Sequence, residues 1–255
     1  MDVALEFGLE DTTAVVTGGS RGIGRAISVG FAEAGANVVP LARDESTLEA
    51  AVAAVRDRGV ESRLEPVDVT DHAAVADCVD RIADDLGVDV VVNNAGVNPD
   101  SALGPPGDVT DAGLRRVVDV NLEGAFACAR AAEEALRASG GALVNVASVG
   151  GLVGLPRQHP YVASKHGLVG LTRSLALDWA PAVRVNCLAP GYVATDLTAD
   201  LRADEDLRAS IEDRTPLDRF ADPAEIAGPA VFLASELASY VTGATLAVDG
   251  GWTAR

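Results

Sequence analysis

The chain has 255 residues, a length that one α/β domain reaches while burying a core of its own. Its 38 acidic and 20 basic residues give a net charge of −18, which disfavours nucleic acid and anionic membrane surfaces as partners. Its hydrophobic residues fall in runs of about six, far below the roughly 20 that a membrane-spanning helix needs, so we expect no membrane segment.

The first residues and the cysteines narrow the protein class further. Residues 1–6 lack the basic and apolar regions of a secretory signal, which predicts a cytoplasmic protein. Widely spaced cysteines, odd in number and in apolar surroundings, predict buried thiols rather than disulfides. These are Cys78, Cys128 and Cys187. The histidines lack the spacing of metal ligands, so we expect no metal site. They are His72, His159 and His166.

Lys165 is the only lysine, and every other basic side chain is an arginine. This composition resembles that of proteins from salt-loving organisms, in which surface carboxylates hold water while salt screens their repulsion. A GC-rich genome is the alternative explanation, because its codons favour arginine over lysine. That alternative accounts less well for the acidic excess, so we predict a halophilic protein.

Seven short apolar runs rich in β-branched residues predict strands, and the stretches between them have helical length and spacing. The predicted strands are residues 12–17, 37–42, 63–67, 88–92, 142–147, 184–188 and 245–248. The predicted helices are residues 22–34, 45–58, 71–86, 112–139 and 161–180. Apolar strands joined by right-handed crossovers predict one α/β domain over residues 1–255, a seven-stranded parallel sheet with helices on both faces.

Two loops rich in glycine and proline, residues 98–107 and 150–160, directly follow predicted strands. In an open parallel sheet, ligands bind beyond the carboxyl ends of the strands. We therefore interpret both loops as parts of an active site and not as domain boundaries.

A glycine-rich run, residues 17–24, stands between the first predicted strand and the first predicted helix. In that place Gly18 allows a tight turn, Gly22 lets the backbone approach a pyrophosphate, and Gly24 lets the helix pack close to the strand. The helix N-terminus offers free N–H groups to the anion. The run therefore predicts a dinucleotide site of the Rossmann kind, the alternative being a simple glycine-rich turn.

The spacing of Gly18, Gly22 and Gly24 resembles that of the short-chain dehydrogenase/reductase family, and further motifs strengthen the resemblance. Asn93-Asn94-Ala95-Gly96 is similar to a family element that braces the sheet and contacts the adenosine half of the cofactor, and Asp68-Val69 to a pair that contacts adenine. The matches extend over residues 12–251, and the nearest types are 3-oxoacyl carrier-protein reductases and sugar or gluconate dehydrogenases.

The resemblance implies a nicotinamide cofactor and a set of residues that bind it. Residues 190–195 resemble the family segment that packs on the nicotinamide and holds its carboxamide. Residues 196–216 then read as a helical lid over the substrate. The predicted cofactor-binding residues are Gly18, Ser20, Arg21, Gly22, Ile23, Gly24, Arg43, Asp68, Val69, Asn94, Ala95, Gly96, Tyr161, Lys165, Pro190, Gly191, Val193 and Thr195.

The end of the second predicted strand decides between the two nicotinamide cofactors, because a carboxylate there binds a ribose 2′-hydroxyl and repels a 2′-phosphate. That position is Ala42, followed by Arg43, and Arg21 in the glycine run is a second candidate for the phosphate. NADP(H) is therefore favoured. NAD(H) stays open, because Asp44 can turn onto the ribose and Arg21 can be a solvated loop charge.

Hydride transfer to a carbonyl builds negative charge on oxygen, so the site needs a proton donor and groups that hold the oxygen and tune the donor. Tyr161 and Lys165 lie four residues apart on a predicted helix, where the ammonium favours the ionised phenol. Ser148 matches the serine that binds the substrate oxygen in the family, and Asn121 the asparagine of its proton relay. We call Asn121, Ser148, Tyr161 and Lys165 the tetrad.

The substrate is less well defined by the sequence. Gln158 and His159 can bond substrate hydroxyls together with Ser148 and Tyr161, or can instead be lid or subunit contacts. We expect a carbonyl or secondary alcohol of a sugar, polyol or sugar acid. The alternatives are a 3-oxoacyl-thioester reductase, disfavoured because residues 138–141 and 179–182 carry no base for an acidic carrier protein, and a non-catalytic nucleotide-binding protein. The resemblance also implies a homotetramer.

Overall fold

The computed structural model describes residues 7–254, so the prediction made from residues 1–6 lies outside the described residues. All seven predicted strands are present and form one parallel sheet in the order β3-β2-β1-β4-β5-β6-β7. The strands are β1 (Thr13–Thr17), β2 (Asn37–Ala42), β3 (Glu65–Pro66), β4 (Val90–Asn93), β5 (Ala142–Val146), β6 (Arg184–Pro190) and β7 (Thr245–Val248). The strand order reverses between β1 and β4, and open parallel sheets bind their ligands in a crevice at such a point.

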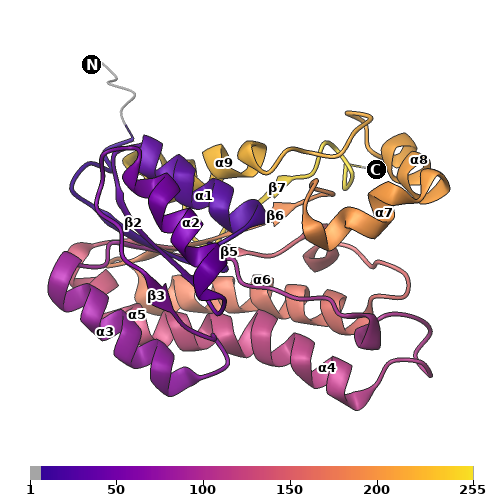
Figure 1. Ribbon diagram of the computed structural model, residues 1–255, viewed down its shortest axis with the longest axis horizontal. Coiled ribbons are helices and arrows are strands. Elements are labelled where there is room, and N and C mark those ends of the chain that lie inside the picture. The colour runs from indigo at the N-terminus through magenta and orange to yellow at the C-terminus, as the bar shows by residue number, and fades with distance from the viewer. Residues whose placement is uncertain (1–6, 255) are drawn as a thin grey trace.

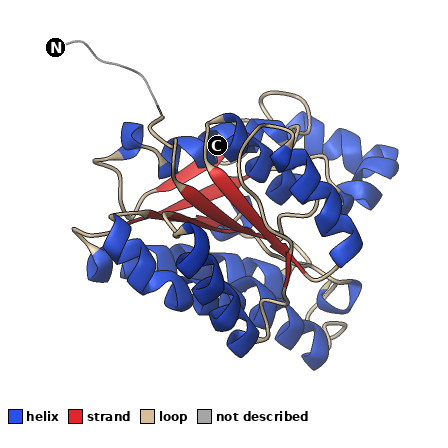
Figure 2. Cartoon of the chain, turned by 60° about the vertical axis from the view of Figure 1, so that its left-hand side comes forward, coloured by secondary structure: helices blue, strands red, loops and turns tan. Residues whose placement is uncertain are grey.

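Helices cover both faces of the sheet, as Figures 1 and 2 show. One face carries α1 (Gly22–Glu33), α2 (Glu45–Arg56) and α9 (Ala224–Ala234). The other carries α3 (His72–Leu86), α4 (Asp111–Val118), α5 (Gly124–Ser139) and α6 (His159–Trp179). Two short helices, α7 (Ala199–Ala203) and α8 (Glu205–Arg214), form the predicted lid segment at one end of the molecule.

The central strands are buried on both faces because successive side chains point to opposite helical layers. In β1, Ala14 and Val16 pack with α1 and α9, whereas Val15 packs with α3 and α5. In β5, Val144 and Leu143 divide between the same two layers. This double burial explains why these strands read as unbroken apolar runs.

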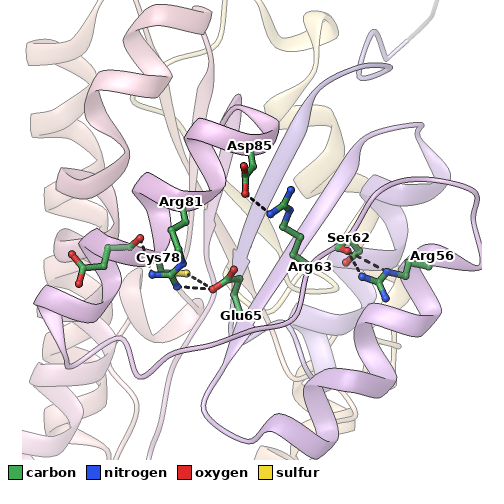
Figure 3. Close-up of polar contacts among 8 residues, drawn as sticks. Arg56, Ser62, Arg63, Glu65, Cys78, Arg81 and Asp85 are labelled. Atoms are coloured by element: carbon green, nitrogen blue, oxygen red, sulfur yellow. Dashed lines mark hydrogen bonds and ion pairs between the residues drawn. The ribbon is translucent and has the colours of Figure 1, made fainter.

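The edge strand β3 is shorter than the predicted residues 63–67, because only Glu65 and Pro66 pair with β2. Side chains at this edge form ion pairs with α3: Arg63, which precedes the strand, pairs with Asp85, and Glu65 within the strand accepts a bond of 2.7 Å from Arg81 (Figure 3). Charged side chains and a proline at an edge discourage pairing with another chain. The edge is therefore closed by ion pairs to the neighbouring helix.

Two helical features differ from the sequence prediction. The expected helix 112–139 is divided into α4 and α5 by a π-helical turn, Asp119–Glu123. Helix α9 was not predicted, because Gly228 and Pro229 within it are helix breakers. Helix α9 packs closely against α1, because a Cβ added to Gly30 of α1 would lie only 2.9 Å from Ala227 Cβ of α9.

The described residues also bear on the cysteines and on membrane segments. Cys78, Cys128 and Cys187 are all buried with free thiols, as predicted. Within residues 7–254, none of the helices combines the length and the apolar character that crossing a bilayer requires.

Candidate active site

The glycine loop after β1 packs directly against the loop after β4, at the point where the strand order reverses. Gly18 has φ +63°, and a Cβ there would lie 3.0 Å from Ala95 Cα. A Cβ on Gly24 would collide with the Gly18 carbonyl and the Asn94 amide. Asn94 Nδ2 donates to Thr17 O at 2.9 Å, which ties the two loops together. Close backbone contact therefore fixes how the two loops pack, and it leaves no room for a side chain at Gly18 or Gly24.

The N-terminus of α1 opens toward this crevice without a capping side chain. Arg21 stands at the cap position but makes no capping bond, and the first turn contains no acidic residue. By contrast, the Asp44 carboxylate caps α2 by accepting from Thr47 N at 2.8 Å. Free N–H groups at a helix N-terminus bind phosphate. The loop and α1 therefore fit the pyrophosphate of a dinucleotide.

Both arginines expected to bind a 2′-phosphate are present at the crevice, each beside a carboxylate. Arg21 lies 3.6 Å from Asp196, and Arg43 lies 3.6 Å from Asp68. The Asp196 pair joins the glycine loop to the start of the lid segment. All four side chains are partly or largely exposed, so these pairs are weak.

Two carboxyl groups beside these arginines are held ionised by local hydrogen bonds. Bonds from Thr47 and Ser46 lower the pKa of Asp44, whose carboxylate serves the cap of α2. Burial raises the pKa of Asp68, but bonds from the backbone and hydroxyl of Thr70 outweigh it and lower the pKa. The Asp44 carboxylate is therefore hydrogen-bonded to the first turn of α2.

Ser148, Tyr161 and Lys165 meet beyond the carboxyl end of β5. Lys165 is 4% exposed, donates to Val146 O at 2.8 Å and lies 5.7 Å from the centre of the Tyr161 ring. Ser148 Oγ accepts from Gly150 N at 3.1 Å. A Cβ on Gly96 would lie 3.5 Å from Lys165 Nζ, so the loop after β4 borders the same space.

Burial controls the protonation of these groups. It raises the pKa of the Tyr161 phenol more than the neighbouring Ser148 hydroxyl lowers it. The net direction is opposite to the effect expected from Lys165, because burial of the phenol itself is the largest influence on its pKa. Burial also lowers the pKa of the Lys165 ammonium to about 8. The phenol is therefore a proton donor at neutral pH in this state.

Asn121 lies in the π-helical turn and is fully buried. Its Oδ1 accepts from Val97 N at 2.8 Å, and its Nδ2 donates to Val97 O at 3.0 Å and Ser164 Oγ at 3.2 Å. Ser164 Oγ in turn donates to Tyr161 O at 2.8 Å. The π-turn thus places Asn121 between the loop after β4 and the second turn of α6.

The segment 190–195 leaves β6 and passes beside the glycine loop. A Cβ on Gly191 would lie 2.7 Å from Asp249 Cα, and Pro190 pairs with Val248 in the sheet. Val193 is buried, whereas the Thr195 methyl group would lie 3.3 Å from a Cβ on Gly22. The structure therefore brings this segment to the same crevice as the other predicted cofactor-binding residues.

The predicted substrate residues differ in their surroundings. Gln158 Oε1 accepts from Asn98 Nδ2 at 3.0 Å, which joins the start of α6 to the loop after β4. His159 is exposed at the first position of α6. Among residues 7–254, no cluster of three or more side chains is arranged to hold a metal ion.

A profile of the family described as enoyl-(acyl carrier protein) reductase matches residues 18–253. The chain belongs to the short-chain dehydrogenase/reductase family. This dehydrogenase is 43% identical to cis-4-hydroxycyclohexanecarboxylate dehydrogenase of Sinomonas cyclohexanicum over 96% of its length and 97% of the relative. It is 38% identical to the 3-oxoacyl-[acyl-carrier-protein] reductase of Staphylococcus epidermidis over 94% of its length and 98% of the relative.

A solved structure is similarly close: a gluconate 5-dehydrogenase from Burkholderia cenocepacia in complex with NADP and tartrate. Its TM-score is 0.93 and its identity 34%, with 98% of each chain covered. The dehydrogenase is therefore an oxidoreductase that acts on CH–OH groups with a nicotinamide cofactor.

The dehydrogenase also has an aromatic cluster beside the tetrad that sequence reasoning missed. The ring centres of Tyr192 and Trp252 are 4.8 Å apart, and the Arg214 guanidinium carbon lies 4.3 Å from the centre of the Trp252 ring. These residues come from three distant segments, so no spacing links them. The only sequence signal was the terminal motif containing Trp252.

Proposed function

We propose that this dehydrogenase interconverts a carbonyl and a secondary alcohol of a sugar, polyol or sugar acid, with NADP(H) as its preferred cofactor. The observation that carries the proposal is the meeting of Ser148, Tyr161 and Lys165 beside a glycine loop shaped for a pyrophosphate. The gluconate 5-dehydrogenase and the hydroxycyclohexanecarboxylate dehydrogenase support the substrate class.

In this proposal the bound cofactor supplies or accepts the hydride, and the tetrad handles the proton. Tyr161 donates its proton to the carbonyl oxygen in reduction and takes it back in oxidation. Ser148 holds that oxygen by a hydrogen bond. Lys165 supplies positive charge beside the phenol and binds ribose hydroxyls. Asn121 relays protons, and its bonds to Val97 and Ser164 fix its place.

Arg21 and Arg43 support the NADP(H) preference, and the cap at α2 occupies the carboxylate of Asp44 that would favour NAD(H). Fluorescence titration in molar KCl with NADPH and NADH tests this preference. NADPH binds at least tenfold more tightly if the arginines receive the 2′-phosphate, a difference of about 1.4 kcal/mol. Equal or tighter binding of NADH overturns the preference while leaving the oxidoreductase intact.

The second candidate function is reduction of a 3-oxoacyl thioester, favoured by the similarity to the 3-oxoacyl carrier-protein reductase. The net charge of −18 argues against docking of an acidic carrier protein. Initial rates with acetoacetyl-CoA and with a panel of sugar acids and polyols separate the two candidates. A higher kcat/KM for the thioester would favour the second.

The acidic surface supports a halophilic origin, and the exposed apolar side chains on α5 and α6 support a homotetramer. Phe126 on α5 and Leu177 on α6 are 45% and 82% exposed, as an interface between copies requires. A higher unfolding midpoint in molar KCl than in dilute buffer supports halophily, and an unchanged or lower one contradicts it. A monomeric mass in light scattering at high salt overturns the tetramer.

A further inference from the structure

Arg214 is a cation without a carboxylate partner beside the aromatic cluster of Tyr192 and Trp252. It is the last residue of α8 and is exposed, with its guanidinium over the Trp252 ring. It takes part in none of the ion pairs found among residues 7–254. Although the chain carries a net charge of −18, this guanidinium stacks on an aromatic ring and leaves its hydrogen-bond donors free for an anion.

The aromatic cluster connects Arg214 to the tetrad. Trp252 shares a buried cluster with Val149, the residue directly after Ser148. Trp252 also contacts Tyr192, which is close enough to Tyr161 to raise the pKa of that phenol. Arg214 and Tyr161 therefore both lie beside the aromatic cluster of Tyr192 and Trp252.

Backbone contacts hold Arg214 in this place. Leu217 N donates to Gly250 O at 3.1 Å, which fastens the end of the lid to the carboxyl-terminal turn. Gly251 has φ +89°, and a Cβ there would lie 2.7 Å from Pro216 Cγ. Only glycine permits this approach, so the turn that carries Trp252 and the helix end that carries Arg214 are positioned together.

We propose that Arg214 binds the carboxylate of a hydroxy-acid substrate while the tetrad acts on its hydroxyl-bearing carbon. The proposal rests on the proposed function and narrows its substrate class from sugars, polyols and sugar acids to the acids. A guanidinium matches a carboxylate with two parallel hydrogen bonds. Stacking on Trp252 excludes water from one face of the cation, which strengthens its attraction for an anion.

The test compares paired substrates that differ only in the carboxylate. D-gluconate is paired with D-glucitol, and cis-4-hydroxycyclohexanecarboxylate with cis-4-(hydroxymethyl)cyclohexanol, in which a hydroxymethyl group replaces the carboxylate. Arg214→Gln lowers kcat/KM for each acid by about 10- to 100-fold, the range for one charged hydrogen bond, and leaves each neutral partner within about twofold. Arg214→Lys recovers part of the loss for the acids.

Arg208→Gln is the matched control, because Arg208 lies on the same helix, pairs with Glu212 at 4.0 Å and changes the net charge equally. It leaves the ratio of acid to neutral kcat/KM unchanged. Equal losses in Arg214→Gln and Arg208→Gln, or equal losses for acids and neutral partners, overturn the role of Arg214.

A binding measurement keeps this inference separate from the proposed function. In a Trp179→Phe background Trp252 is the only tryptophan, so its fluorescence reports a ligand on Arg214 without turnover. With NADP+ present, both acids change this fluorescence saturably, and Arg214→Gln weakens their binding at least tenfold. Saturable, Arg214-dependent binding without turnover refutes the proposed function alone. Turnover of the acids with binding independent of Arg214 refutes only the inference.

Discussion

The proposed cofactor end and the proposed substrate end of the site are built in different ways. At the cofactor end, two short loops meet backbone to backbone, and Gly18 and Gly24 leave no room for a side chain. At the substrate end, side chains from distant segments meet, as Tyr192, Arg214 and Trp252 do. The cofactor end is therefore sensitive to added volume, whereas the substrate end can change specificity by exchange of single side chains.

The largest expected effect falls on the proton donor at the substrate end. Tyr161→Phe removes the phenol that would donate the proton and lowers kcat by about 10³-fold. Cofactor binding weakens by no more than about tenfold, because Tyr161 is one of many predicted cofactor contacts and the glycine loop is untouched. Steady-state rates and NADPH titration measure the two effects. Retention of more than a few per cent of turnover contradicts the assigned role of Tyr161.

Lys165 lies between the two ends and gives stability a pH dependence. With a folded-state pKa of about 8 against the ordinary 10.5, folded Lys165 loses its proton at lower pH than unfolded Lys165 does. The unfolded state then binds more protons, so the free energy of unfolding rises between these pH values, by at most about 3 kcal/mol. The gain is absent below pH 8.

Denaturant unfolding of wild type and Lys165→Met across this pH range measures the effect. As the pH rises, the free energy of unfolding of the wild type increases relative to that of Lys165→Met. Parallel stability curves show that burial does not perturb Lys165.

Added volume at the cofactor end has the next largest effect. Gly24→Ala forces a Cβ onto the Gly18 carbonyl and the Asn94 amide, which destabilises the fold by about 1–3 kcal/mol and weakens NADPH binding. Gly228→Ala is the control, because nothing lies within 4 Å of that added Cβ. It stabilises α9 by up to about 1 kcal/mol. Similar unfolding midpoints for both variants contradict the close packing of the loop.

The smallest effect concerns the pair that joins the two ends. Asp196→Asn frees Arg21 for a 2′-phosphate and tightens NADPH binding about two- to fivefold, since exposed pairs are worth less than about 1 kcal/mol. NADH binding is unchanged. Asp206→Asn removes an equal charge from the lid and serves as the control. An equal gain for NADPH and NADH shows that Arg21 does not meet the 2′-phosphate.

Local patterns in the sequence are enough to predict most of the sheet and the residues of the candidate site. The central strands are buried on both faces, so each of them forms an unbroken apolar run that can be recognised in the sequence. The glycine run can be recognised because it lies between such a strand and a helix. The structure brings Ser148 and Tyr161 to one place, although the first follows a strand and the second lies on a helix. The strands and the glycine run depend on local periodicity and backbone conformation, whereas Ser148 and Asn121 were assigned from the resemblance to the family.

The remaining features depend on contacts between distant segments, which local sequence patterns do not contain. Helix α9 exists against its own breakers since α1 packs on it at Gly30. Strand β3 consists of Glu65 and Pro66 alone, and ion pairs tie this edge of the sheet to α3. The Asp44 carboxylate caps α2. The guanidinium of Arg214 lies over Trp252, whose position is set by the turn at Gly250 and Gly251. Pairwise contacts across the chain leave no periodic pattern in a single sequence, so they appear only once the chain is folded.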